Sequence, residues 1–160
     1  MASIRHFTAT GYVAWRGLIL VHWHNKVQAL LPPGGHIDPN EDPVQAVLRE
    51  VLEETGLFVE VLPSDLPFQL KYPIQIFPPE TILVEDIQEP VTGPHQHIDM
   101  IYFCRPLGSI QNLKAGWHWV TEEELVRGSK VLISDGTYAV PPEDVRLLGL
   151  RAIKRASDEL

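Results

Sequence analysis

The chain has 160 residues, of which 44% are hydrophobic and 21% charged, and its formal net charge is −8. This length accommodates one domain with a sizeable core, so we expect a single domain over residues 1–160. An acidic chain lacks the positive charge with which proteins grip a phosphate backbone, so nucleic acid is not an expected partner. A small phosphorylated substrate remains compatible, because bound magnesium can reverse the local sign of the charge.

The sequence contains no signal for a membrane or for export. No apolar run approaches the roughly 20 residues that a transmembrane helix needs. The N-terminus lacks the apolar region and the small-residue cleavage site of a signal peptide. A cytoplasmic location without a membrane partner is therefore expected, while the oligomeric state stays open, with a homodimer as one option.

The first part of the chain is rich in predicted strands. Residues 7–15 and 17–24 contain many β-branched and aromatic side chains and are separated by a break at residues 16–17, so they are expected to be neighbouring strands. A short strand at residues 28–31 follows. The segment at residues 32–35, Pro-Pro-Gly-Gly, is expected to be an irregular loop because it cannot continue a regular element.

A helix that starts after Asp42 and ends at Gly56 is the best-supported element. Asp42 is a favourable N-cap, Pro43 suits the first helical position, and Gly56 can adopt the left-handed conformation that ends a helix. Aliphatic residues follow the i, i+3, i+4, i+7, i+8 spacing of a buried stripe. These residues are Val44, Val47, Leu48, Val51 and Leu52.

The rest of the chain alternates predicted strands with two helices. The strands are expected at residues 58–62, 70–77, 81–87, 97–105 and 117–120. Thr121 is expected to cap a short helix over residues 122–126, and a last helix is expected over residues 142–156. The only cysteine, Cys104, is expected to be a small buried residue in a strand. Together these elements predict an α/β fold with a mixed sheet covered by helices.

Three glutamates in the first helix form a candidate metal site. Glu50, Glu53 and Glu54 stand at i, i+3 and i+4, which places their carboxylates on one side of a helix. Like charges at this spacing destabilise an isolated helix unless a cation lies between them. Carboxylates are the ligands that Mg²⁺ and Mn²⁺ prefer, although the same pattern also occurs on an ordinary solvated helix face.

The neighbouring residues have physical roles that fit such a site. Gly34 and Gly35 allow a tight turn whose N–H groups can face an anionic ligand. Glu41 is placed either to cap backbone donors or to reach the metal. Arg49 precedes Glu50 and lies one turn from Glu53, so it can orient or partly neutralise a carboxylate.

Residues 35–57 resemble the Nudix box, G-x5-E-x7-R-E-U-x-E-E-x-G-U, in which U is a bulky aliphatic residue. Every specified position is filled, by Gly35, Glu41, Arg49, Glu50, Val51, Glu53, Glu54, Gly56 and Leu57. The box covers 23 of the 160 residues. Residues 119–125 also resemble a frequent late feature of this family, in which a strand runs into a short helix.

The resemblance implies an α/β/α sandwich and a hydrolase that cleaves acid anhydrides in phosphorus-containing compounds. It implies a magnesium-dependent pyrophosphohydrolase of a nucleoside diphosphate derivative, such as a nucleoside triphosphate, an ADP-ribose-like compound or a dinucleotide, with Mn²⁺ as a substitute metal. It assigns metal ligation to Glu50, Glu53 and Glu54. It also makes Glu53 the expected base within the box, Arg49 the residue that holds the carboxylates, and Glu41 a support for the loop or the outer shell of the metal.

Two further interpretations stay open at this point. A nucleotide-binding or sensor module with the same fold and little or no hydrolysis is the alternative function, although the complete set of carboxylates argues against it. The substrate cannot be named, because Tyr72 and Pro73 both lie where a subclass marker is expected in the family and indicate different substrates.

Residues outside the box provide additional candidates. His95, His97 and Asp99 alternate along a predicted strand and so share one face. They can be exposed polar residues, a transition-metal site or contacts to the substrate, and we expect His97 and Asp99, with Gly34 and Gly35, at the substrate. The acidic side chains in residues 80–89 are either solvated charges or the source of a base from outside the box; the candidates are Glu85, Asp86 and Glu89.

Overall fold

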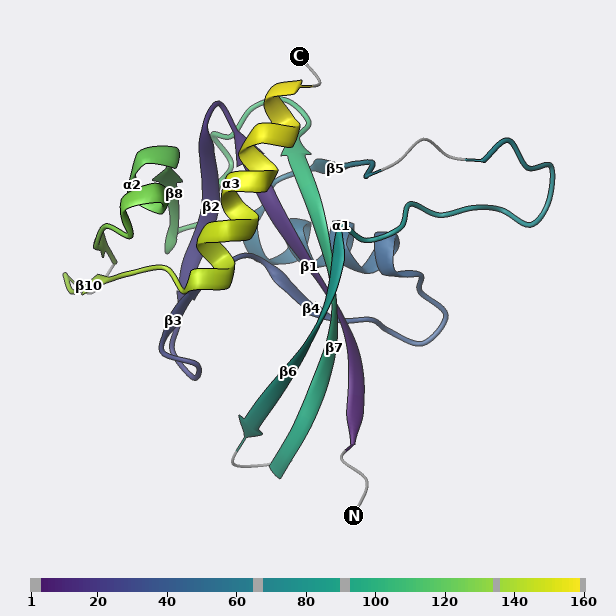
Figure 1. The fold of residues 1–160 in the computed structure, drawn as a ribbon, viewed down its shortest axis with the longest axis horizontal. Helices are drawn as coiled ribbons and strands as arrows, with labels where there is room; N and C mark the ends of the chain where they lie inside the picture. The colour runs from purple at the N-terminus through teal and green to yellow at the C-terminus, as the bar shows by residue number, and fades with distance from the viewer. Residues whose placement is uncertain (1–3, 65–67, 90–92, 134–135, 159–160) are drawn as a thin grey trace.

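A computed structural model of the protein describes residues 4–64, 68–89, 93–133 and 136–158. In chain order its elements are β1 (Arg5–Trp15), β2 (Leu18–His24), β3 (Ala29–Leu31), β4 (Gly34–His36), α1 (Pro43–Thr55), β5 (Val59–Leu62), β6 (Thr81–Glu89), β7 (Gly93–Pro106), β8 (Trp117–Thr121), α2 (Glu122–Arg127), β9 (Val131–Leu132), β10 (Tyr138–Ala139) and α3 (Glu143–Asp158). Strands β1 to β8 form one sheet, and β9 pairs with β10 (Figure 1).

The centre of the sheet is the parallel pair of β1 and β7, in which Thr8 lies opposite Asp99. Strands β2 and β4 pair antiparallel with different parts of β1, and β5 and β6 pair antiparallel with different parts of β7. Strands β3 and β8 extend the sheet beyond β2. One parallel pair among antiparallel neighbours confirms the predicted mixed sheet.

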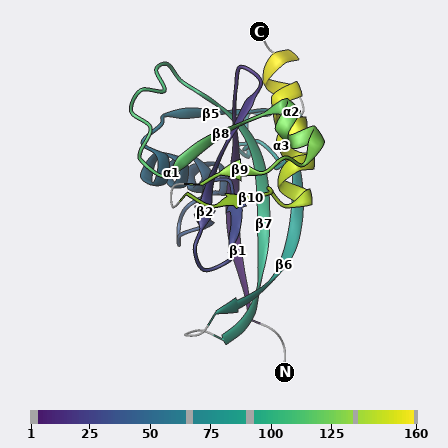
Figure 2. The same cartoon turned by 90° about the vertical axis from the view of Figure 1, so that its left-hand side faces the viewer.

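Helices cover both faces of this sheet, as Figure 2 shows from the side. On one face α1 packs Val47 and Val51 against Ala9 and Val13 of β1. On the other face α3 packs against the alternate residues of β1 and β7, and α2 packs against α3 and β8. This core includes Tyr12, Ile101, Phe103, Leu125, Val145 and Ala152. Successive strand residues therefore belong to two separate cores, which confirms the α/β/α sandwich.

The predicted boundaries of α1 are confirmed by its caps. The carboxylate of Asp42 accepts hydrogen bonds from the N–H groups of Val44 and Gln45, and the Gln45 side chain accepts one from the Asp42 N–H. Gly56 ends the helix at φ 78°. The fully buried residues of the helix are Ala46, Val47, Val51 and Thr55, whereas Val44, Leu48 and Leu52 are partly buried.

Two sequence predictions about the loops are wrong. Residues 70–77 form no strand: Tyr72 and Ile74 are 86% and 88% exposed, and Pro73 has no N–H to give to a sheet. Residues 32–35 are not irregular throughout, because β4 begins at Gly34 and pairs antiparallel with β1, where Gly35 lies opposite Ala9. A glycine pair after two prolines is thus an edge strand here, because glycine allows the backbones to come close together.

The remaining predicted strands and helices are confirmed to within a few residues. Cys104 is fully buried in β7, as expected. The pair β9 and β10 was not predicted, because each strand has only 2 residues. None of the helices in the described ranges is long and apolar enough to cross a membrane.

Candidate metal and catalytic site

Arg49 is the centre of a charged cluster where β4 meets α1. Its Nε and Nη2 atoms each donate a hydrogen bond of 2.9 Å to a different oxygen of Glu41. Its Nη1 donates to Glu50 at 2.8 Å and to Glu53 at 3.3 Å. We call Glu41, Arg49, Glu50, Glu53 and Glu54 the Arg49 cluster. A single planar guanidinium holds three of its carboxylates and offsets their repulsion.

Glu41 uses both carboxylate oxygens within the protein. Besides its two bonds to Arg49, it accepts a hydrogen bond of 3.1 Å from the N–H of Asp38 in the loop before α1. The hydrogen bond from Arg49 is the main reason that the pKa of Glu41 lies below its usual value. The geometry therefore favours the loop-supporting alternative for Glu41 over direct metal ligation.

The two glycines of β4 allow carboxylates and backbone to come very close. The N–H of Gly34 donates a hydrogen bond of 3.1 Å to Glu54, so this group faces a side chain of the protein rather than a substrate anion. A Cβ atom on Gly35 would lie 2.5 Å from Oε1 of Glu50. On Gly34 it would lie 2.8 Å from the carbonyl oxygen of Ala9. A side chain on Gly35 would therefore displace Glu50, and one on Gly34 would push β4 away from β1.

Three carboxylates of the cluster fit a hard cation in their chemistry. Arg49 donates to one oxygen each of Glu50 and Glu53, and the Gly34 N–H donates to one oxygen of Glu54. Within the part of the chain that the structure describes, the second oxygen of each carboxylate is therefore available to another ligand. Burial, followed by repulsion from Glu50 and Glu53, raises the pKa of Glu54. A divalent cation would relieve that repulsion.

The carboxylates do not converge tightly on one point. Among the described residues, the group of three ligand atoms that all lie within 4.8 Å of one another consists of histidines and not of these glutamates. Glu53 extends towards solvent with 61% of its side chain exposed, whereas Glu50 is 16% exposed. Such an open arrangement suits Mg²⁺, which keeps several waters and substrate oxygens in its shell.

His97 and Asp99 lie away from the Arg49 cluster, on the face of the sheet that α3 covers. Asp99 alternates with Ile101, which packs in the core beneath α3, whereas the adjacent Met100 packs towards α1. Asp99 is 4% exposed and accepts a hydrogen bond of 2.8 Å from Thr8. Burial raises the pKa of Asp99. Thr10, which donates a hydrogen bond to Asp99, lies opposite Gly34, and the His36 ring after Gly35 lies 5.0 Å from the His97 ring, so neighbouring side chains separate the two predicted substrate residues from the glycines.

The acidic residues near the end of β6 do not reach the Arg49 cluster either. Glu85 lies opposite His97 in the sheet, and burial, with the charges of Asp99 and Asp144, raises its pKa to about 7. Asp86 accepts a hydrogen bond from Gln96 at 2.9 Å. The third candidate for a base from outside the box, Glu89, has its side chain outside the described part of the structure. The site therefore draws its carboxylates from α1 and from the turn before it.

The chain matches the NUDIX domain over residues 7–141. It belongs to the Nudix family. This membership confirms the resemblance inferred from residues 35–57, and with it the hydrolase class that the resemblance implied. The comparison with curated proteins finds no match.

Several solved structures share the fold. A Nudix-family hydrolase from Clostridium perfringens superposes with a TM-score of 0.74 at 24% identity, over 94% of this chain and 97% of that one. The MutT protein from Methanosarcina mazei Go1 gives 0.56 at 16% identity and covers 98% of both chains. The C. elegans Ap4A hydrolase gives 0.50 at 17% identity, over 99% of this chain and 98% of that one. At these identities the likeness concerns the fold.

Helix α1, which carries most of the Nudix box and is called the Nudix helix below, is also held by residues that the sequence did not single out. The Lys114 ammonium donates to the backbone carbonyl of Glu53, and the indole N–H of Trp117 donates to that of Glu54 at 3.1 Å. Both donors come from the segment that follows β7. They lie 61 and 63 residues from their acceptors, so no local pattern could have indicated them.

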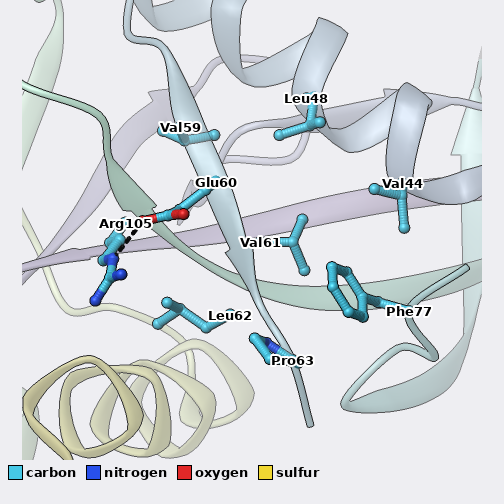
Figure 3. A pocket seen from close by; sticks show the side chains of 9 residues that line it. All are labelled: Val44, Leu48, Val59, Glu60, Val61, Leu62, Pro63, Phe77 and Arg105. Atoms are coloured by element: carbon cyan, nitrogen blue, oxygen red, sulfur yellow. Dashed lines mark hydrogen bonds and ion pairs between the residues drawn. The ribbon is translucent and has the colours of Figure 1, made fainter. Parts of the chain in front are cut away.

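A cavity of about 450 Å³ lies beside the other side of the Nudix helix (Figure 3). It is lined mostly by apolar side chains of α1 and β5 and by Phe77, and Glu60 and Arg105 form an ion pair at its wall. Val44 and Leu48 point into it, and they lie roughly 120° and 160° from Glu50 around the helix axis. The cavity is therefore separate from the Arg49 cluster.

Proposed function

We propose that this Nudix protein is a magnesium-dependent pyrophosphohydrolase that cleaves a phosphoanhydride bond in a nucleoside diphosphate derivative. The observation that carries the proposal is the arrangement of one guanidinium, Arg49, between the carboxylates of Glu41, Glu50 and Glu53. That arrangement fixes the carboxylates near the surface while each of Glu50 and Glu53 keeps an oxygen for further ligands. A stable fold alone does not require like charges to be concentrated in this way.

Glu50, Glu53 and Glu54 are the proposed metal ligands. When bound, Mg²⁺ or Mn²⁺ supplies a polarised water and positive charge for the oxygens of the reacting phosphate groups. Glu50 and Glu54 approach from the β4 side, where Gly35 and Gly34 contact them. Two carboxylates supported by backbone and one exposed carboxylate leave room for waters and for a polyphosphate chain.

Glu53 is the proposed general base. Its side chain is 61% exposed, so a water molecule can reach it, and Arg49 engages only its Oε2 atom. Its other oxygen can accept a proton from the attacking water. Arg49 is a positioning residue in this proposal, and Glu41 holds Arg49 in turn through two parallel hydrogen bonds.

The proposed substrates are small nucleotides: nucleoside triphosphates, ADP-ribose-like compounds or dinucleotides. Asp99 remains a proposed substrate contact because it is a buried carboxylate next to two threonines, an environment that can select a hydrogen-bonding partner. For contact with both Asp99 and the Arg49 cluster, the substrate has to extend from the α3 face of the sheet past the edge strand β4. His97 lies next to Asp99 on the same face and belongs to the histidines considered below.

A substrate panel with Mg²⁺ tests the proposed function. It contains ordinary and oxidised nucleoside triphosphates, ADP-ribose, NADH, nucleotide sugars and dinucleoside polyphosphates, and the released phosphate and pyrophosphate are measured separately. We expect Mg²⁺-dependent turnover of at least one compound, and loss of that turnover in Glu54→Gln. Binding of a nucleotide without hydrolysis of any compound would contradict the proposal and support the sensor alternative.

A further inference from the structure

Three histidines from distant parts of the sequence meet at one end of the sheet. His6 lies near the start of β1, and His95 and His97 lie near the start of β7, so the parallel pairing of these strands brings them together. One ring nitrogen of each lies within 4.8 Å of the others. We call these residues the histidine cluster. This end of β1 and β7 projects beyond the helices in both views (Figures 1 and 2).

The spacing of the nitrogens is close to that of metal ligands. The Nε2 atoms of His95 and His97 are 3.3 Å apart and share a hydrogen bond, in which a metal would replace the proton. In a tetrahedral site with metal–nitrogen bonds of about 2.0–2.1 Å, ligand nitrogens lie roughly 3.3–3.4 Å apart. Two of the three imidazoles already have this separation. The His6 nitrogen lies within 4.8 Å of both, so a change in the orientation of its ring would bring the third imidazole to the metal.

Hydrogen bonds to neighbouring groups also orient two of the rings, as is usual for metal-binding histidines. Nδ1 of His95 lies 2.9 Å from the carbonyl oxygen of Gly93, so its N–H donates there and leaves the lone pair of Nε2 directed at His97. His95 is 5% exposed, which limits other orientations of its ring. Nδ1 of His6 contacts Nε2 of His36, the last residue of β4, at 3.2 Å.

We propose that His6, His95 and His97 form a binding site for a divalent transition metal of the Zn²⁺ type, distinct from the magnesium site of the Arg49 cluster. Three imidazoles favour Zn²⁺, Co²⁺, Ni²⁺ or Cu²⁺, whereas Mg²⁺ prefers oxygen ligands. Glu85 lies opposite His97 in the sheet and places a carboxylate beside the site. A metal here links the first residues of β1 to β7, and a water or an anion completes its coordination.

His36 is a positioning residue in this proposal. It is not one of the three mutually close histidines, and it contacts His6 through the Nδ1 atom of that ring. Its removal is therefore expected to weaken metal binding by about 10- to 100-fold, as loss of an outer partner usually does. Removal of His95 or His97 is expected to have a larger effect, of at least about 100-fold, because a ligand itself is lost.

The test uses the whole protein, freed of metal with a chelator and then saturated with Mg²⁺. Co²⁺ is added while its visible absorption is recorded, and Zn²⁺ binding is measured by calorimetry. We expect one equivalent of Co²⁺ to bind with the strong bands of tetrahedral coordination. His95→Ala and His97→Ala should abolish this binding at micromolar metal, whereas the matched control His24→Ala, a histidine on β2, should leave it unchanged.

Two further measurements keep the test decisive if a variant folds poorly. In the unaltered protein, Zn²⁺ should shift the ring resonances of His6, His95 and His97 in NMR spectra and leave those of His22 and His24 in place. The variant Glu50→Gln/Glu54→Gln should still bind one Zn²⁺. The proposal is overturned if those three resonances do not move, or if Zn²⁺ binding is lost in the glutamine variant and retained in His95→Ala.

Discussion

The Arg49 cluster and the histidine cluster are built in opposite ways. The Arg49 cluster comes from one helix and the turn before it, and its carboxylates stay spread out around a guanidinium. The histidine cluster comes from positions 6, 95 and 97, yet its nitrogens lie within 4.8 Å of one another. Carboxylates repel one another unless a cation lies between them, whereas imidazole rings carry no fixed negative charge.

The two clusters are predicted to differ in the metals they prefer. One residue that contacts both clusters is His36. Its ring contacts His6 of the histidine cluster, and its backbone carbonyl accepts a hydrogen bond of 3.0 Å from Arg49. The Arg49 cluster should thus support Mg²⁺-dependent chemistry, and the histidine cluster should bind a Zn²⁺-type ion with little effect on that chemistry. The following predictions test this separation.

The largest expected effect is that of Glu53→Gln on turnover. This substitution keeps the shape of the side chain but removes the proposed base, so kcat should fall by about 10²- to 10⁴-fold. Zn²⁺ binding at the histidine cluster should not change. Steady-state kinetics on the best substrate of the panel measures the effect, with Glu122→Gln, an exposed glutamate of α2, as the matched control. Unchanged hydrolysis of every accepted substrate would exclude Glu53 as the essential base.

Arg49→Lys should have the next largest effect. An ammonium group cannot reproduce the two parallel bonds to Glu41 together with the bonds to Glu50 and Glu53, so these carboxylates lose their alignment. We expect kcat/KM to fall by about 10- to 100-fold and the required Mg²⁺ concentration to change. The control Arg127→Lys alters an exposed ion pair on α2 and should have no effect. Equal activity of both variants would contradict a positioning role for Arg49.

Asp42→Ala tests how much the N-cap of α1, the helix that carries most of the Arg49 cluster, stabilises the protein. Loss of the two hydrogen bonds to the Asp42 carboxylate should lower the free energy of unfolding by about 1 kcal/mol. Urea denaturation measures this change. Asp42→Asn should preserve most of the stability, because asparagine is also a good N-cap. A similar loss in Asp42→Asn would mean that the charge, rather than the capping bonds, matters.

The smallest expected effect is the coupling between the clusters. Since they lie on different elements and share few contacts, His95→Ala should change the affinity for Mg²⁺ by less than about 0.5 kcal/mol. Glu54→Gln should change the affinity for Zn²⁺ equally little. Titration of each metal into both single variants and the double variant measures the coupling energy. A coupling above about 1 kcal/mol would contradict the separation of the two clusters.

How much the sequence revealed depends on whether its signals were local. The helix at residues 43–55 was predictable because its N-cap, its apolar spacing and its terminal glycine lie within one segment. The proximity of Arg49 to Glu53 followed from the i, i+4 spacing of a helix, whereas its hydrogen bond to the adjacent Glu50 did not. The contacts of Lys114 and Trp117 with this helix could not be predicted, because they depend on how a segment after β7 returns to it.

The errors have the same origin. The apolar residues from 70 to 77 resemble a strand, but none of the strands in the described ranges pairs with them. The pattern at His95, His97 and Asp99 correctly placed three side chains on one face, yet it did not reveal that His6 joins the histidines. That knowledge requires the register of β1 against β7, which pairs His6 with His97. Long-range strand register is set by packing of the whole sheet rather than by a local motif.

Chelation and metal replacement test the central claim most directly. The protein is treated with EDTA, hydrolysis of its best substrate is measured, and circular dichroism monitors the fold before Mg²⁺ or Zn²⁺ is returned. We expect turnover to disappear while the fold persists, and Mg²⁺ alone to restore turnover, both in the unaltered protein and in His95→Ala. Turnover that survives EDTA, or that returns only with Zn²⁺, would contradict a magnesium site formed by Glu50, Glu53 and Glu54.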